Sequence, residues 1–138
     1  MFLDNPDVLV VMHDDRLVNE QGMILKDSFK DRTKHGLIAN IVKSSYYGHR
    51  IAFRKSFMSI FMPIPSKCKL YDQYIGLCAE RSKKVLFIDQ VLTDYLTHDN
   101  NYSKDRVSIY ERILVRWNLV YSFAKSKLDK TKRFHPHS

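Results

Sequence analysis

The sequence lacks any apolar run close to the roughly 18 to 20 residues that a membrane-spanning helix needs, so we expect no such helix. Its opening residues, MFLDNPD, have neither a basic segment nor a long apolar one, which predicts no signal peptide and a cytoplasmic chain. Cysteine is scarce. Cys68 and Cys78 show no partner motif, which argues against a disulfide framework or a zinc site, and Cys78 is expected to be a small buried residue. With 138 residues, 44% of them hydrophobic, the chain is predicted to be one modest globular domain.

The positive charge of the chain is unevenly distributed. Residues 1–102 carry 14 Lys and Arg against 12 Asp and Glu, whereas residues 103–138 carry 9 against 3. A basic C-terminal segment can meet anionic lipid, a nucleic acid or an acidic protein. The simpler interpretation is a solvated helix face followed by a frayed end.

Short strands alternate with helices along the first half of the chain. The apolar run 8–12 predicts a buried strand, and the turn 19–22 predicts a small hairpin between residues 17–18 and 23–25. Residues 32–44 have helical apolar spacing, 51–53 form another short apolar run, and 56–62 predict a short helix that Pro63 and Pro65 end.

The second half is predicted to contain two helices and two strands. Asp72 opens a helix that runs to Ser82, and two strands are expected at 85–88 and 91–97. The last helix shows apolar residues at helical spacing: Val107, Tyr110, Leu114, Trp117, Tyr121 and Ala124. This interleaving predicts an α/β fold.

Four stretches, in this order and spacing, resemble the second half of family-two glycosyltransferases, especially the rhamnosyltransferase-like group. They are NPDV with HDDRLVNEQG (5–8 and 13–22), YGHRIAFRK (47–55), PIP with YDQYIGL (63–65 and 71–77), and FIDQVLTDYLTHDNN (87–101). Each stretch alone is a weak signal, but together they cover about residues 5–103.

The resemblance implies the C-terminal portion of a GT-A, Rossmann-like domain. Residues 1–102 would be its acceptor-side half, residues 103–128 an amphipathic helix packed on it, and residues 129–138 a basic, disordered tail. In the family, the N-terminal half binds the nucleotide and carries an Asp-x-Asp metal motif. Asp14 and Asp15 fall on a later motif, so most ligands for the expected Mg²⁺ or Mn²⁺ should lie outside this chain.

The resemblance makes Asp72 the candidate general base, which would deprotonate an acceptor hydroxyl as that hydroxyl attacks the anomeric carbon. The alternative is a purely structural helix cap, since aspartate is among the best residues for that role. A short side chain at a helix start after a proline-rich loop can fill both roles.

The other candidate residues follow from the same motifs. His98 lies in a loop that in relatives runs near the donor diphosphate, where it could contact phosphate or metal, or else cap the following helix. Arg54 could neutralise phosphate or lie at a solvated helix start, and Gly48 permits a close backbone approach. The candidate substrate-binding residues are Gly48, Arg54, Tyr71, His98, Asn100 and Asn101, and His98 is also the candidate metal ligand.

The chain departs from the family pattern at several positions. His49 stands where relatives have cysteine, Gln73 and Tyr74 replace two tryptophans, Leu96 replaces an arginine, and Asp99 replaces a glycine. The loss of aromatic bulk and of a positive charge around the site predicts altered activity, or at least an altered acceptor choice.

The leading functional hypothesis is transfer of a sugar from a nucleotide-sugar donor to a saccharide or lipid-linked saccharide acceptor in polysaccharide or O-antigen assembly. Through its basic last helix the chain could also rest on the inner membrane surface. The first alternative is a non-catalytic remnant or interaction module that lacks the donor half. The second, a basic nucleic-acid-binding module, lacks a recognisable motif, so nucleic acid is not an expected partner.

Overall fold

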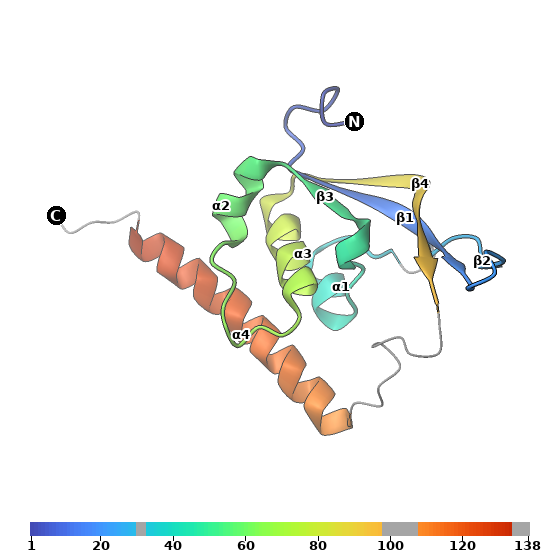
Figure 1. The fold of residues 1–138 in the computed structure, drawn as a ribbon. Helices are drawn as coiled ribbons and strands as arrows, with labels where there is room; N and C mark the ends of the chain where they lie inside the picture. The colour runs from blue at the N-terminus through green and yellow to red at the C-terminus, as the bar shows by residue number, and fades with distance from the viewer. Residues whose placement is uncertain (30–32, 98–107, 134–138) are drawn as a thin grey trace.

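The computed structural model describes residues 1–29, 33–97 and 108–133, and shows an α/β fold with a mixed sheet and a long C-terminal helix. In Figure 1 the sheet lies on one side of the molecule, α4 lies on the opposite side, and α3 lies between them. The mixed α/β class predicted from the sequence is confirmed. The assignment to a GT-A domain stays a prediction.

The central strand of the sheet is β1, Val10–Val18. It pairs antiparallel with β2 (Ile24–Lys26) and β3 (Ile51–Phe53), and parallel with β4 (Val85–Leu96). The strand predicted at residues 8–12 therefore begins slightly later and runs six residues further. The extension was not predicted because the residues from His13 to Arg16 are polar and do not show the apolar pattern of a buried strand.

The predicted hairpin is confirmed, because Val18 pairs with Ile24 across a turn in which Gly22 has φ 76°. The prediction of two strands at 85–88 and 91–97 is wrong, since one continuous strand, β4, covers both. Its register against β1 shifts between the Met12–Phe87 and Asp14–Val91 pairs. The expected break lies at this irregularity, which interrupts the alternation of side chains without ending the strand.

The helix predicted at residues 32–44 is much shorter in the structure. α1 spans only Leu37–Val42, after Gly36 at φ 91°. Leu37 and Ile41 pack against the core, while Ile38 and Val42 are exposed. The buried side chain of Asn40 holds the turn by donating to the carbonyl oxygens of Lys34 and Gly36 and to Glu80 Oε1.

α3, Tyr71–Ser82, is the helix at the centre of the core and agrees closely with the prediction. Its buried face includes Tyr74, Leu77 and Cys78, and both cysteines are buried and free. The short segment before it consists of a 3-10 helix, η3 (Lys55–Phe57), and α2 (Met58–Phe61), which ends ahead of Pro63 as expected.

Tyr46 packs directly against Gly76 of α3. A Cβ added to Gly76 would lie 2.2 Å from Tyr46 Cγ. The Tyr46 hydroxyl donates to Glu80 Oε1 at 2.9 Å, and its pKa is raised, chiefly by burial and then by the Glu80 charge. Tyr46 and Tyr74 are thus core residues, whereas Tyr47 and Tyr71 are exposed.

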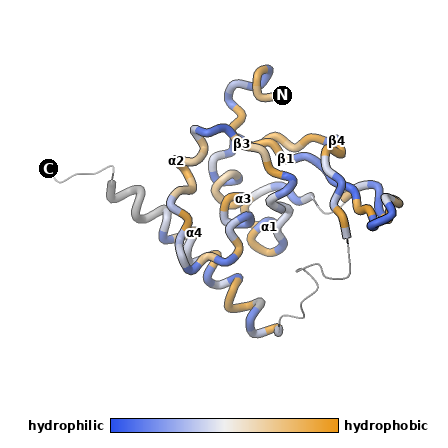
Figure 2. Tube along the Cα trace, viewed as in Figure 1, coloured by the Kyte–Doolittle hydropathy of each residue, from blue (hydrophilic) through white to orange (hydrophobic). Residues whose placement is uncertain are grey.

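α4, Ile109–Arg133, packs on α3 with an unexpected face. Leu119 and Ser122 are buried and Phe123 packs on the core, whereas Tyr110, Leu114, Trp117 and Tyr121 are exposed. At 100° per residue these two sets lie on nearly opposite faces of the helix. In Figure 2, hydrophobic and hydrophilic segments alternate along α4. The helix also extends to Arg133, beyond the predicted boundary at 128. Val107 and residues 134–138 lie outside the described residues.

Candidate functional site

Asp72 is the second residue of α3. The N-cap is Leu70, and no side chain caps the helix there, so the prediction of Asp72 as the N-cap is wrong in position. The carboxylate still satisfies part of the first turn, because its Oδ1 accepts the backbone N–H of Gln73 at 2.8 Å. It is half-buried and directly follows the exposed Tyr71.

The pKa of Asp72 is raised above its ordinary value of 3.8. Burial is the main cause, since desolvation disfavours the charged form. The backbone N–H groups of Gln73, Asp72 itself and Gly48 act in the opposite direction, as does the charge of His49. The result is a carboxylate that is fixed in position and more basic than one in water.

Gly48 and His49 reach this site from a 3-10 helix, η2 (Gly48–Arg50). His49 Nε2 lies 2.9 Å from Asp15 Oδ2 on β1. The imidazole also stacks on the Tyr95 ring of β4, with centroids 4.9 Å apart and an interplanar angle of 24°. The imidazole is thereby fixed between a carboxylate and an aromatic ring, while its charge acts on Asp72.

A buried ionic network lies beneath His49. The Arg50 guanidinium is almost completely buried and donates to the His13 carbonyl oxygen at 2.9 Å. It lies 3.4 Å from Asp14 Oδ1 and 3.2 Å from Asp15 Oδ1. The Asp15 Oδ1 atom is buried without a hydrogen bond, so only the ionic attraction compensates it.

Asp14 is held in its ionised form. Burial acts to raise its pKa, but hydrogen bonds from Ser28 and from the N–H groups of Asp15 and Phe29, together with the Arg50 charge, outweigh that effect and lower it. Its oxygens are therefore already used within the fold.

A hollow of about 590 Å³ lies next to Asp15 and Tyr95. Tyr47 and Phe29 also line it, and its positive groups are Lys26 and Arg50. Aromatic walls with a few polar groups are a common composition for small-ligand sites. We call this hollow the β1 groove.

The predicted site residues are only partly brought together. Gly48 and Asp72 meet, and Tyr71 stands beside Asp72. Arg54 instead binds the N-terminal segment through the carbonyl oxygens of Val8 (2.8 Å), Asn5 (3.3 Å) and Phe2, and lies over the Phe2 ring. This arrangement gives Arg54 a structural role. His98, Asn100 and Asn101 lie outside the described residues.

The described residues do not fit a metal centre. Within residues 1–29, 33–97 and 108–133, no group of three or more His, Cys, Asp or Glu could hold an ion. The adjacent carboxylates Asp14 and Asp15 do not provide free ligands, because Arg50, Ser28 and His49 already contact them. His13 Nδ1 lies 2.8 Å from the Asp14 carbonyl oxygen, so this ring nitrogen is also engaged within the fold.

Sequence reasoning missed the roles of His49, Arg50 and Asp15. Two adjacent aspartates inside an apolar strand require a buried cation, and that requirement was the available signal. The stretch that follows Gly48 supplies both partners, His49 and Arg50.

Comparisons with known proteins return no relative. No protein-family model, no curated protein and no solved structure matches the chain.

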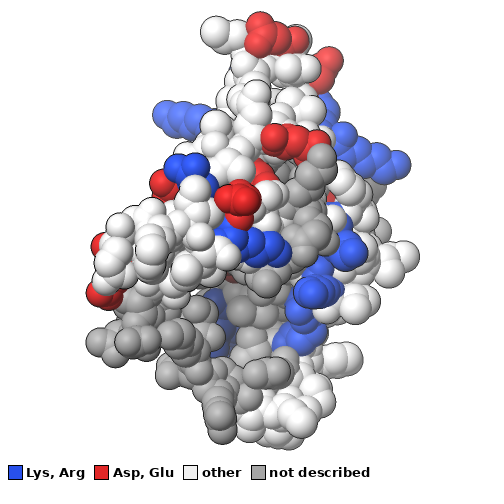
Figure 3. All heavy atoms as spheres, turned by 90° about the vertical axis from the view of Figure 1, so that its right-hand side faces the viewer, with Lys and Arg blue, Asp and Glu red and all other residues white. Residues whose placement is uncertain are grey.

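Within the described residues, none of the helices combines the length and apolarity needed to cross a membrane. Acidic and basic side chains are interspersed on the face that Figure 3 shows.

Proposed function

We propose that this chain serves glycosyl transfer from a nucleotide-sugar donor to a saccharide acceptor, with Asp72 as the general base. The observation that carries the proposal is the half-buried Asp72 carboxylate with its raised pKa, beside Gly48 and His49. A sugar hydroxyl is a poor nucleophile until a base accepts its proton, and burial makes a carboxylate a stronger base.

The surroundings of Asp72 support an acceptor site. Exposed Tyr71 and Tyr47 offer aromatic faces of the kind that pack against sugar rings. Tyr47, next to Gly48 in the sequence, also lines the β1 groove, which adds Tyr95 and charged groups. On this proposal the chain is the acceptor-side portion of a GT-A domain. The nucleotide and any Mg²⁺ or Mn²⁺ would be bound outside the described residues.

The activity is tested by incubating the native polypeptide with a panel of radiolabelled nucleotide sugars and with saccharide or lipid-linked saccharide acceptors. The proposal predicts transfer of label to at least one acceptor, with release of a nucleotide. Absence of transfer across the panel, with the polypeptide folded, would contradict it and favour the second candidate.

The second candidate is a non-catalytic interaction module, and the exposed apolar face of α4 favours it. Ile109, Tyr110, Ile113 and Trp117 are each more than 60% exposed. Such a contiguous patch is typical of a surface that binds a partner. Sedimentation velocity separates the cases, because a module of this kind should self-associate or aggregate when isolated.

We also propose peripheral contact with the inner membrane surface through α4, whose residues 125–133 include Lys125, Lys127, Lys130, Lys132 and Arg133 against a single acidic residue, Asp129. Co-sedimentation with anionic vesicles should be lost as salt rises. Vesicle binding that does not change with salt would contradict this electrostatic mode.

A further inference from the structure

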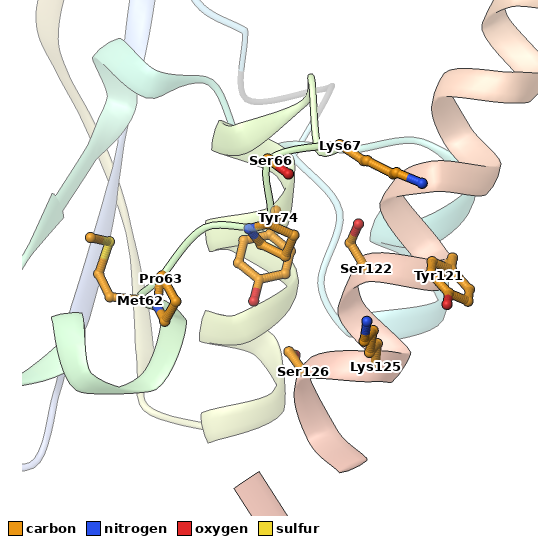
Figure 4. Close-up of a pocket in the computed structure, with 10 residues that line it drawn as sticks. Met62, Pro63, Ser66, Lys67, Tyr74, Tyr121, Ser122, Lys125 and Ser126 are labelled. Carbon is orange, nitrogen blue, oxygen red and sulfur yellow. The ribbon is translucent and has the colours of Figure 1, made fainter. Parts of the chain in front are cut away.

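A second hollow lies on the opposite side of α3, between the loop after α2 and the last helix. It has a volume of about 420 Å³ and is lined by residues 62, 63 and 65–67 of the loop together with Tyr74 and four residues of α4. Figure 4 shows Lys67 reaching from the loop toward α4, and Ser122 pointing into the space between them. We call this hollow the α4 pocket.

The charged groups of the α4 pocket are both positive. Lys67 and Lys125 line it, and none of the described residues that line it is acidic. Neither lysine forms an ion pair within the described part of the chain. Two ammonium groups beside one hollow repel each other, so an anion that reaches both is favoured there.

Hydroxyl groups stand beside the two lysines. Ser122 is 4% exposed, and its hydroxyl has no hydrogen-bond partner among the described residues. Ser126 donates to the Phe123 carbonyl oxygen at 2.8 Å and interacts with the Tyr74 hydroxyl. Because no described residue occupies it, the Ser122 hydroxyl can donate a hydrogen bond to a ligand oxygen.

The remaining wall of the α4 pocket is apolar. Met62, Pro63 and Pro65 form the loop side, and the ring of Tyr121 stands on the helix side. The pocket therefore combines a cationic, hydroxyl-bearing part with an apolar part. A free inorganic anion would leave the apolar part unused.

We propose that the α4 pocket binds a phosphate monoester that carries an apolar chain. The phosphate oxygens meet the ammonium groups of Lys67 and Lys125 and the hydroxyl of Ser122, while the chain packs on Met62, Pro63 and Tyr121. Lysine binds phosphate as a point charge and hydroxyls complete the coordination of its oxygens. This site is separate from Asp72 and does not depend on glycosyl transfer.

The proposal is tested with octyl phosphate as the probe, titrated calorimetrically into the folded full chain. Saturable binding is expected, at least tenfold tighter than for inorganic phosphate because the alkyl chain is buried. Octyltrimethylammonium has the same chain with the opposite charge and is expected not to bind. No saturable binding of octyl phosphate, or equal binding of the ammonium compound, would overturn the proposal.

Matched variants locate the site. The double variant Lys67→Gln/Lys125→Gln should bind octyl phosphate at least tenfold more weakly, whereas Lys43→Gln/Lys55→Gln removes the same charge elsewhere on the surface and should change affinity less than twofold. Ser122→Ala, which adds no bulk, should weaken binding several-fold. Equal affinities in the two double variants, both with wild-type melting temperatures, would overturn the assignment.

Vesicles distinguish a lipid headgroup from a soluble phosphate. Binding to phosphatidylcholine vesicles that contain phosphatidic acid, lost in Lys67→Gln/Lys125→Gln but kept in Lys43→Gln/Lys55→Gln, assigns the pocket to a membrane lipid. Binding of octyl phosphate without binding to these vesicles assigns it to a soluble phosphate monoester.

Discussion

His49 Nε2 lies 2.9 Å from Asp15 Oδ2, so that a 3-10 helix and the central strand are joined next to the candidate base. The Tyr95 ring fixes the other side of the imidazole. Because the charge of His49 lowers the pKa of Asp72, the histidine tunes the base as well as holding its surroundings. His49 is therefore a positioning residue in the proposed reaction.

Replacing His49 should shift the pH dependence of transfer. His49→Ala removes the charge that holds the pKa of Asp72 down, so the acidic limb of the kcat/KM profile should move to higher pH. The rate at the optimum should fall by about 100-fold, as is common when a catalytic group is slightly misplaced. A profile that drops uniformly at every pH would show that His49 has only a structural role.

The raised pKa of Asp72 has a consequence for stability. The folded state holds the proton more tightly than the unfolded state, so ionising Asp72 costs stability as pH rises from 3.8 through the folded pKa. Asp72→Asn cannot ionise, so its stability relative to wild type should increase across that window and then stay constant. Urea midpoints at pH 3 and pH 7 measure this difference, and an Asp72→Asn variant that is less stable at pH 7 than at pH 3, relative to wild type, would contradict the assigned shift.

Gly76→Ala should destabilise the fold even though alanine favours helices. Alanine normally gains about 1 kcal/mol over glycine inside a helix, but here its Cβ would meet Tyr46 Cγ at 2.2 Å. Overpacking of a filled core costs about 1–3 kcal/mol, and the urea midpoint should fall accordingly.

Gly48→Ala is the matched comparison. An added Cβ at Gly48 meets no atom within 4 Å, so the urea midpoint should stay unchanged. If Gly48 provides close approach to the acceptor, transfer should still weaken. A Gly48→Ala variant that is stable and fully active would contradict a role for Gly48 in acceptor binding.

Removing the buried Arg50 charge should strongly lower the free energy of unfolding. Arg50→Met leaves Asp14 buried without a cation and Asp15 with only His49 beside it. Loss of one partner from a buried ion pair typically costs about 3–5 kcal/mol. Arg16→Gln breaks the exposed Arg16–Asp94 pair and should change the urea midpoint little. Equal effects of the two substitutions would show that the Arg50 network does not hold the strand and η2 together.

Local patterns predicted the elements of the fold better than their contacts. The hairpin, α3 and the mixed α/β class followed from turn residues and apolar spacing. The strand from Val10 to Val18 was predicted too short, because the compensation of Asp14 and Asp15 comes from Arg50, more than 30 residues away in sequence. Such a partner cannot be identified from the strand alone.

For the last helix, too, the sequence predicted the element but not its packing. Its aromatic spacing correctly predicts an amphipathic helix, yet the packed side is that of Leu119 and Ser122. A stripe of large apolar residues predicts an apolar helix face, but it does not predict whether that face packs against the same chain. In the candidate site, Asp72 accepts a hydrogen bond from the Gly48 backbone, whereas Arg54 binds the N-terminal backbone instead of facing Asp72.

The central claim is that Asp72 accepts the proton of the acceptor hydroxyl. The most direct test compares transfer by the wild type, Asp72→Asn and the exposed control Glu20→Gln in the native polypeptide, at saturating donor and acceptor. The account predicts that Asp72→Asn loses about 10²- to 10⁴-fold in kcat while keeping its fold, and that Glu20→Gln retains wild-type kcat. Wild-type kcat in a folded Asp72→Asn variant would contradict it.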